Sequence, residues 1–443
     1  MFGKNETPII LPTNPDVIVI GAGIAGVTAT RTLMQQGISV LVVEARDRVG
    51  GRAYTEQETF GVPYDHGCTW LHSADVNPLS PLIRDQARYD IFDFGAREPI
   101  YFVPENQKGH QTGRRATAQE VSDIEKAEDA LYDDLWAYDA VTHGDISIHD
   151  LRPPKNKWDE LAQLRKGPFE AGVHSDRLSV IDYQTQYETG TEWMVPQGFA
   201  AGIFKALGSV PVTLGVTVEK VDWQGPTIKV QTNQGTITCR AVVVTVPTEI
   251  IADETLKFFP ALPADKMAAF HELPMAVLDK ITLQFDPAFR SLVPDADTNE
   301  AYIEAPEGMN QIDSWHSHLL CPFGQAMSTM FVGGQLARDI SADSQEAAKD
   351  FALSSLASVL GSDVKKLFRK GHATKWLADT FASGGYAYSN VGKNHLRETA
   401  RRPVAERLFF AGEALHGKWA TMAPGAYLTG QQAANEIIDA LIS

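Results

Sequence analysis

Short apolar runs alternate with an amphipathic segment at the start of the chain. Residues 16–20 form a β-branched apolar run typical of a buried strand, and a glycine-rich turn follows it. Residues 27–36 carry apolar positions at helical spacing and end at Gly37, which predicts a helix. Residues 38–44 are a second apolar run. A strand, turn, helix and strand within about thirty residues predict the first unit of a parallel α/β sheet.

Similar patterns return later in the chain. Residues 241–246 and 408–410 predict further buried strands, and residues 210–237 look like short strands with Gly and Pro turns. Helices are predicted at 344–360 and 425–442, and a charged one near 119–140. The remainder of 77–192 and of 264–370 is less regular. Segments of the sheet are therefore separated by long irregular stretches.

Composition sets broad limits on the function. The 443 residues are 44% hydrophobic and 21% charged, enough for a sizeable core in one to three domains. The net charge of −17 argues against nucleic-acid binding, because phosphates repel an acidic surface. An acidic surface would favour a cationic substrate, although solubility alone accounts for it.

Cysteines and apolar runs indicate the compartment. Cys68, Cys239 and Cys321 are odd in number and lack CxxC spacing, so we expect neither a disulfide framework nor a metal site. Residues 1–15 lack the apolar core of a signal peptide. No uncharged apolar run reaches the length of a membrane span, about 18 residues or more. We expect a cytoplasmic protein without membrane contact.

The strongest motif is Gly-Ala-Gly-Ile-Ala-Gly at 21–26. Gly21 permits the tight turn, Gly23 lets the backbone approach a pyrophosphate, and Gly26 lets helix and strand pack closely. The following helix N-terminus presents free N–H groups to phosphates. Glu44, 23 residues after Gly21, can accept hydrogen bonds from an adenosine ribose. This pattern predicts a dinucleotide site without distinguishing FAD from NAD.

The next segment distinguishes them. Two glycines stand between arginines in Arg-Asp-Arg-Val-Gly-Gly-Arg at 46–52, which suits a loop around a pyrophosphate with Arg52 as counter-charge. Together with Glu44 and Ala45, this segment resembles the FAD signature of the flavin-containing amine oxidase family. That family includes monoamine oxidases, polyamine oxidases, L-amino acid oxidases and a histone demethylase.

Six further blocks resemble the family in its own order: 194–199, 216–221, 273–280, 384–388, 410–413 and 424–426. The resemblance implies an α/β fold, with a Rossmann-type FAD-binding domain and an α+β substrate domain built from two insertions. We expect the FAD-binding domain at 1–76, 192–262 and 372–443. The substrate-binding domain is then expected at 77–191 and 263–371.

The resemblance also implies which residues contact FAD. Glu413 would meet its ribityl or phosphate portion, and the backbone of Ala423, at the start of the last helix, would stabilise the flavin N1/O2 edge. Gly385 stands where covalent monoamine oxidases carry a cysteine, so we expect non-covalent FAD. The whole predicted set is Gly21, Gly23, Ile24, Ala25, Gly26, Glu44, Ala45, Arg46, Gly50, Gly51, Arg52, Thr69, Trp70, Val218, Gly412, Glu413 and Ala423.

On the substrate side, the resemblance implies that Lys280 holds a water near flavin N5. Tyr386 would form one side of an aromatic slot, with Trp419 or Met422 opposite. Met422 stands where monoamine oxidases have a second tyrosine, which argues against their aromatic cage.

Trp70, His72 and the following Asn-Pro-Leu at 77–79 resemble polyamine and spermine oxidases most. In that subfamily a histidine at this place lines the catalytic tunnel, so we expect His72 to orient the amine. Three acids of the substrate stretch could bind a distal ammonium, although we expect solvated surface charges: Asp182, Glu188 and Glu192.

The resemblance implies an FAD-dependent amine oxidase that passes a hydride from the carbon beside an amine nitrogen to flavin N5. The resulting imine hydrolyses to an aldehyde or ketone and an amine, and O2 or another acceptor reoxidises the flavin, with H2O2 formed from O2. A polyamine-like substrate is favoured. The alternatives are a cyclic or aromatic amine (nicotine-type or monoamine), an L-amino acid, or, more distantly, an FAD-dependent desaturase or isomerase or a non-catalytic FAD-binding protein. A homodimer is the default assembly.

Overall fold

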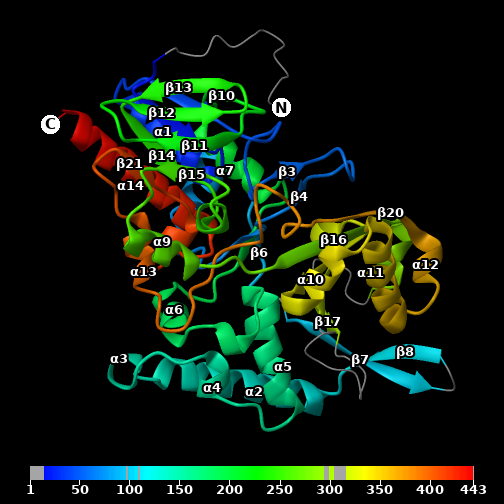
Figure 1. Ribbon diagram of the computed structural model, residues 1–443. Helices are drawn as coiled ribbons and strands as arrows, with labels where there is room; N and C mark the ends of the chain where they lie inside the picture. Colours follow the sequence, from blue (N-terminus) through cyan, green and yellow to red (C-terminus); the bar gives the residue numbers. More distant parts are fainter. Residues whose placement is uncertain (1–13, 96–97, 108–109, 294–298, 304–315, 443) are drawn as a thin grey trace.

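The computed structural model describes residues 14–442, apart from 96–97, 108–109, 294–298 and 304–315 (Figure 1). We expect that segment 1–15 is not a signal peptide. Most of that segment, residues 1–13, lies outside the described part of the chain. Among the described residues, no helix combines the length and apolar character needed to cross a membrane.

A parallel sheet of five strands joins distant parts of the sequence in the order β10-β2-β1-β14-β21. Its strands are β1 (Val17–Ile20), β2 (Val40–Val43), β10 (Val212–Thr213), β14 (Ala241–Val244) and β21 (Leu408–Phe410). The strands predicted at 16–20, 38–44, 241–246 and 408–410 are confirmed. They are recognisable because a parallel sheet covered on both faces requires continuous apolar runs.

Helices cover one face of this sheet (Figure 1). Val17 and Val19 pack with α1 (Ile24–Gln35) and α14 (Ala423–Ile442). Helix α1 begins three residues before the predicted start, because Gly23 is its N-cap and the glycine motif supplies its first turn. The close approach of Gly430 to Ala25 brings the two helices together, since a Cβ on Gly430 would lie 2.4 Å from the Ala25 carbonyl oxygen.

A second, smaller sheet covers the other face. Ile18 and Ile20 pack there with Val221 and Val230. The sheet has the order β13-β12-β11-β15, and the predicted strand cluster at 210–237 is confirmed. Its strands are β11 (Val218–Asp222), β12 (Ile228–Thr232), β13 (Gly235–Cys239) and β15 (Lys257–Phe259), with α8 (Thr248–Ala252) and α9 (Ala264–His271) beside them.

A seven-stranded sheet lies beside these layers (Figure 1). It has the order β20-β16-β19-β18-β17-β7-β8. Its strands are β7 (Ile100–Gln107), β8 (His110–Arg115), β16 (Leu278–Phe285), β17 (Asn299–Ile303), β18 (His316–Leu320), β19 (Met327–Gly333) and β20 (Phe368–Ala373). Two helices, α10 (Gly334–Ala342) and α11 (Gln345–Leu360), pack on it. The predicted helix at 344–360 is confirmed, and Ser344 caps it by accepting the Ala347 N–H at 3.1 Å.

A helical layer closes the other side of the seven-stranded sheet, at the bottom of Figure 1. The charged helix predicted near 119–140 is α2 (Ala118–Ala137), which starts at a capping box between Thr117 and Glu120. The layer also contains α3 (Ala140–His143), α4 (Ile148–Leu151), α5 (Lys157–Leu164), η2 (Arg165–Ala171), η3 (Ser175–Arg177) and α6 (Val180–Thr185).

Short elements connect the layers. A three-stranded sheet has the order β5-β9-β6, and β3 pairs with β4. Their bounds are β3 (Thr55–Glu56), β4 (Tyr64–Asp65), β5 (Trp70–Leu71), β6 (Phe92–Asp93) and β9 (Trp193–Met194). The remaining helical elements are η1 (Leu82–Ala87), α7 (Phe199–Leu207), η4 (Pro287–Ser291), η6 (Pro322–Gly324), α12 (Val364–Leu367), α13 (Leu396–Arg401) and η7 (Glu413–Leu415).

The division into two domains stays a prediction, and the packing bears on its boundaries. Phe270 and Leu273 fall within the expected insertion 263–371, yet they pack in one core with Ile18 of the parallel sheet. Strand β20 crosses the expected boundary at residue 372. This packing favours an insertion that begins after α9, because α9 buries its apolar face on the parallel-sheet side.

We expect Gly26→Ala to destabilise the protein. A Cβ on Gly26 would lie 2.0 Å from the Gly21 carbonyl oxygen, so α1 would have to move off β1. Overpacking of this kind costs about 1–3 kcal/mol in the free energy of unfolding, measurable by urea titration. Gly225→Ala is the matched control, since its Cβ would lie 3.7 Å from the nearest atom, the Thr227 carbonyl oxygen. Equal stability of both variants would contradict the role assigned to Gly26.

Candidate active site

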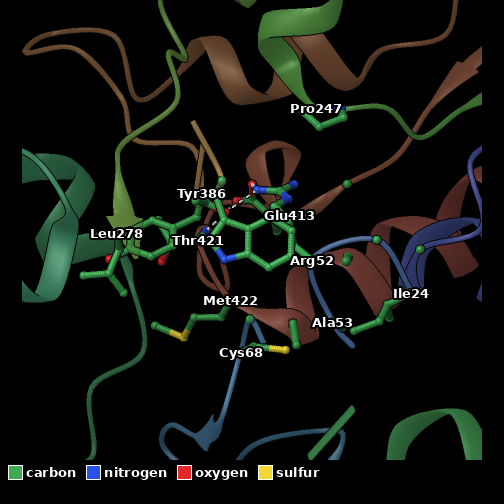
Figure 2. A pocket seen from close by; sticks show the side chains of 18 of the residues that line it. Ile24, Arg52, Ala53, Cys68, Pro247, Leu278, Tyr386, Glu413, Thr421 and Met422 are labelled. Atoms are coloured by element: carbon green, nitrogen blue, oxygen red, sulfur yellow. Dashed lines mark hydrogen bonds and ion pairs between the residues drawn. The ribbon is translucent and has the colours of Figure 1, made fainter. Parts of the chain in front are cut away.

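A cavity of about 720 Å³ extends from the parallel sheet to the helical layer. All the residues predicted for the site line it except Gly26 and Trp419. Its wall also includes residues not predicted from sequence, among them Trp376, Phe381, Tyr132, Lys166, Phe169, Glu170 and Tyr183. In Figure 2, Leu278, Tyr386 and Met422 lie toward one side of the cavity, and Ile24 and Pro247 toward the other.

Four glycines form one wall, which we call the glycine cradle: Gly21, Gly23, Gly50 and Gly51. Gly21 and Gly50 have φ values of +103° and +107°, which residues with a side chain rarely adopt. A Cβ on Gly23 would meet only the Gly50 carbonyl oxygen, at 3.9 Å, so the space beside it is open. Two loops predicted separately are thus joined, and the Gly50 N–H donates to the Ala22 carbonyl at 2.9 Å.

The start of α1 and the end of β2 complete this half of the cavity. Among the residues that the structure describes, no side chain caps α1, so its first N–H groups are available to an anion. The buried Glu44 carboxylate accepts the N–H of Ala22 at 2.8 Å and that of Arg46 at 2.9 Å. A glycine cradle, an uncapped helix N-terminus and a fixed carboxylate fit the pyrophosphate and ribose of FAD, so these residues could hold that cofactor.

Arg52 and Glu413 form an ion pair within the cavity wall (Figure 2). One guanidinium nitrogen of Arg52 donates to Glu413 at 2.9 Å and to the Gly385 carbonyl at 2.8 Å. Glu413 also accepts the N–H of Ala387 at 3.2 Å and that of Thr421 at 3.1 Å. Arg52 was predicted as a counter-charge for phosphate, and in the structure its guanidinium is paired with Glu413. Both oxygens of Glu413 are engaged by protein donors, so its direct contact with FAD stays a prediction.

Arg46 is held by a segment not predicted from sequence. Its guanidinium lies 2.5 Å from a carboxylate oxygen of Asp379 and 5.3 Å from the centre of the Phe381 ring. That oxygen also accepts the Phe381 N–H at 2.8 Å, which fixes the turn. The only sequence feature near Asp379 and Phe381 that indicated a site was block 384–388. A loop that folds back across the chain leaves no periodic pattern of apolar residues.

Lys280, on β16, is 5% exposed and faces segment 65–69. Its amino group donates to the Asp65 carbonyl at 3.0 Å, to the Gly67 carbonyl and to the Thr69 hydroxyl. Burial lowers the pKa of Lys280 to about 8, against the opposing charge of Asp65. Three protein acceptors use all three protons of an ammonium, so the predicted bond to a water requires the neutral amine, which keeps a lone pair.

Tyr386 and Met422 both line the cavity, and Trp419 does not. The Trp419 ring is buried and packs on Tyr187, with ring centres 4.8 Å apart. Of the two alternatives predicted opposite Tyr386, only Met422 reaches the cavity. Burial raises the pKa of Tyr386, so the phenol stays neutral and donates its proton to the Glu170 carbonyl at 2.5 Å.

His72 is paired with an acid. Its Nδ1 lies 2.6 Å from a carboxylate oxygen of Glu192, and its ring stacks on Trp70 with centres 6.4 Å apart. Burial works against protonation, but the Glu192 carboxylate outweighs it and raises the pKa of His72. The carboxylate of Glu192 therefore favours the protonated form of His72, which suits orientation of an amine better than removal of a proton.

We call the part of the cavity beyond Tyr386 its far end: Tyr132, Lys166, Glu170, Tyr183 and Glu188. Lys166 pairs there with Glu170. The three acids expected at the solvated surface all line the cavity: Glu188 is exposed, Glu192 is partly buried and Asp182 is buried.

Asp182 is buried and bound to Arg397 at 2.6 Å, which gives it a structural role. That expectation was wrong for Asp182 and Glu192 because sequence does not show which surface a charge will face. Among the described residues, no group of three or more His, Cys, Asp or Glu side chains is arranged to hold a metal.

Stability should depend on pH through Lys280. Its pKa is about 8 in the folded protein against an ordinary 10.5, so between these values the unfolded chain binds more protons. Folding stability then rises with pH across that window, by on the order of 2–3 kcal/mol relative to Lys280→Met. Chemical denaturation of both proteins at several pH values measures the difference. Lys229→Met, at an exposed lysine, is the control, and a flat difference for Lys280→Met would contradict the assignment.

Comparison with known proteins agrees with this arrangement. The flavin containing amine oxidoreductase family matches residues 24–438. Polyamine oxidase 2 of Arabidopsis thaliana is 30% identical over 454 residues, covering 96% of this chain and 88% of that protein. Lysine-specific histone demethylase 1 homolog 3 of the same plant is 26% identical, covering 100% of this chain and 31% of that protein. A solved structure of putrescine oxidase, the wild type bound to putrescine, has the same fold, with a TM-score of 0.74 and 20% identity over 96% of this chain and 99% of that chain. The chain belongs to the flavin-containing amine oxidoreductases and is an FAD-dependent amine oxidoreductase.

Proposed function

We propose that this enzyme oxidises a polyamine-like alkyl amine. The observation that carries the proposal is one continuous cavity, which runs from the glycine cradle past Lys280 and Tyr386 to the acidic far end. A linear amine with a second positive charge fits such a cavity, because its reacting end and its distal ammonium need different surroundings. The names of the relatives, polyamine oxidases and putrescine oxidase, support the same substrate class.

The charges at the far end favour a cation. Lys166 is paired with Glu170, and His72 with Glu192. Glu188 accepts the Gly190 N–H at 3.2 Å and forms no ion pair within the described parts of the chain. Glu188 therefore has no cationic partner within the described residues, and Glu170, although paired with Lys166, keeps 40% of its side chain exposed, so both carboxylates can bind an ammonium.

The cations near this end are already engaged. Lys166 is paired with Glu170, and Arg397 is bound to Asp182. A substrate carboxylate would have to break one of these buried pairs, which is costly. The L-amino acid alternative is therefore disfavoured.

FAD, when bound, supplies the acceptor for a hydride from the carbon next to the amine nitrogen. The chain's own residues position that amine: Tyr386 and Met422 confine its carbon chain, and the pair of His72 and Glu192 stands along the wall. Removal of a hydride from a neutral amine leaves an iminium, and water then adds with loss of a proton to give an aldehyde and either ammonia, from a primary amine, or a shorter amine, from a secondary one. An apolar wall favours the neutral amine, since desolvation disfavours the charged form.

Anaerobic mixing tests the substrate class. We expect spermidine, spermine or putrescine to bleach the flavin absorption faster than cyclic amines or L-amino acids. In Glu188→Gln, kcat/KM for a diamine should fall about tenfold, because a charged hydrogen bond is lost, whereas a monoamine of similar length should be little affected. Glu219→Gln, at an exposed glutamate of β11 outside the cavity, is the matched control. Equal losses for diamine and monoamine would overturn the assignment of Glu188.

We also propose that FAD is bound without a covalent link. Gly385, beside Tyr386, offers no nucleophile, and burial raises the pKa of the Cys68 thiol to about 12, which keeps it in the unreactive protonated form. Acid precipitation of the purified protein should therefore leave all the flavin in the supernatant. Flavin that stays with the precipitated chain would contradict non-covalent binding.

A further inference from the structure

The element η2 contributes three side chains to the cavity wall: Lys166, Phe169 and Glu170. It is a π-helical turn that continues α5 and contains Pro168. Turns of this kind are rare and occur often at functional sites. Because its residues do not follow the spacing of an α-helix, neighbouring positions such as Phe169 and Glu170 can face the same cavity.

One end of η2 is attached to the flavin-side half of the cavity. The Tyr386 hydroxyl donates to the main-chain carbonyl of Glu170 at 2.5 Å. Two residues after Glu170, the Gly172 carbonyl accepts the N–H of Val277 at 3.0 Å, just before β16. The aromatic wall at Tyr386 and the start of β16 are therefore both bonded to the main chain of this turn.

Lys166, near the start of η2, holds the carboxylate of the same residue, Glu170. Lys166, 3% exposed, donates to the Tyr132 hydroxyl at 2.5 Å, to the Tyr183 hydroxyl at 2.9 Å and to the Glu170 carboxylate. Its ammonium also lies 4.4 Å from the centre of the Tyr132 ring. The Glu170 side chain, 40% exposed, is thus held from behind while it lines the cavity.

The turn has little room to move. A Cβ on Gly333 of β19 would lie 1.6 Å from the Pro168 carbonyl oxygen, and one on Gly172 would lie 2.8 Å from that of Val277. Main-chain atoms therefore pack directly on main-chain atoms at both places, and they cannot move aside as a flexible side chain could.

We propose that η2 sets the distance between the aromatic wall at Tyr386 and the carboxylate of Glu170, and thereby selects diamines by the separation of their two nitrogens. This inference rests on the proposed function. A misplacement of about 1 Å at a reacting centre can cost a hundredfold in rate, so a fixed distance gives a steep dependence on chain length. A diamine that is too short leaves its distal ammonium away from Glu170. One that is too long displaces its reacting carbon.

The test compares kcat/KM for linear α,ω-diamines of increasing length in the wild type and in Tyr386→Phe, which keeps the ring and removes the bond to Glu170. We expect one preferred length in the wild type, with neighbouring lengths poorer by about tenfold, and a profile flattened to within a few-fold in the variant. Tyr138→Phe is the matched control. Its hydroxyl donates to the Gly144 carbonyl at 3.0 Å, away from the cavity, so it should keep the wild-type profile.

A second readout does not depend on turnover. Dissociation constants of the same diamines for the dithionite-reduced holoenzyme should show the same preferred length in the wild type and lose it in Tyr386→Phe. Tyr132→Phe and Tyr183→Phe, which each remove one hydrogen bond from Lys166, should broaden both profiles.

Unchanged profiles in Tyr386→Phe would overturn the inference while the proposed function stands. If no diamine bleaches the flavin, the proposed function fails. The dissociation constants then test the inference by themselves. If they show no preferred diamine length in the wild type, the inference is overturned.

Discussion

The carboxylate of Glu413 is the contact on which the site depends. It lies directly after β21 and binds Arg52 from the first glycine-arginine loop, Ala387 from the segment beside Tyr386, and Thr421 from the turn before α14. Three distant parts of the sequence are thus fixed around one buried charge. Because a buried carboxylate is costly unless it is paired, these segments are held in one arrangement.

The cavity changes in character along its length, and its walls come from different layers. The glycine cradle and the start of α1 offer backbone N–H groups to an anionic cofactor. The far end belongs to the helical layer and carries the carboxylates of Glu170, which is matched by Lys166, and of Glu188. Lys280 lies between, on the seven-stranded sheet, and binds segment 65–69. Three layers therefore have to assemble before one amine can meet both ends.

Much of the fold could be predicted from sequence, and the reason differs between elements. Strands β1, β14 and β21 are covered on both faces, so they had to be continuous apolar runs. Helix α11 starts at Ser344 because a serine side chain can cap it. The membership of Phe270 in the parallel-sheet core was not predicted, because α9 shows an apolar face without showing which sheet covers it. The two-residue strands β5, β6 and β9 are too short to leave a pattern.

The candidate site divides in the same way. The sequence by itself determined the glycine cradle and Glu44, because a tight turn, a close backbone approach and a strand-end carboxylate are requirements within one short segment. Only the tertiary structure decided which partners the charges have: Asp182 with Arg397, Lys166 with Glu170, and Arg52 with Glu413. It also placed Met422 in the cavity and Trp419 against Tyr187. Most of these contacts join residues far apart in the chain, so their energies depend on how the layers pack and not on local spacing.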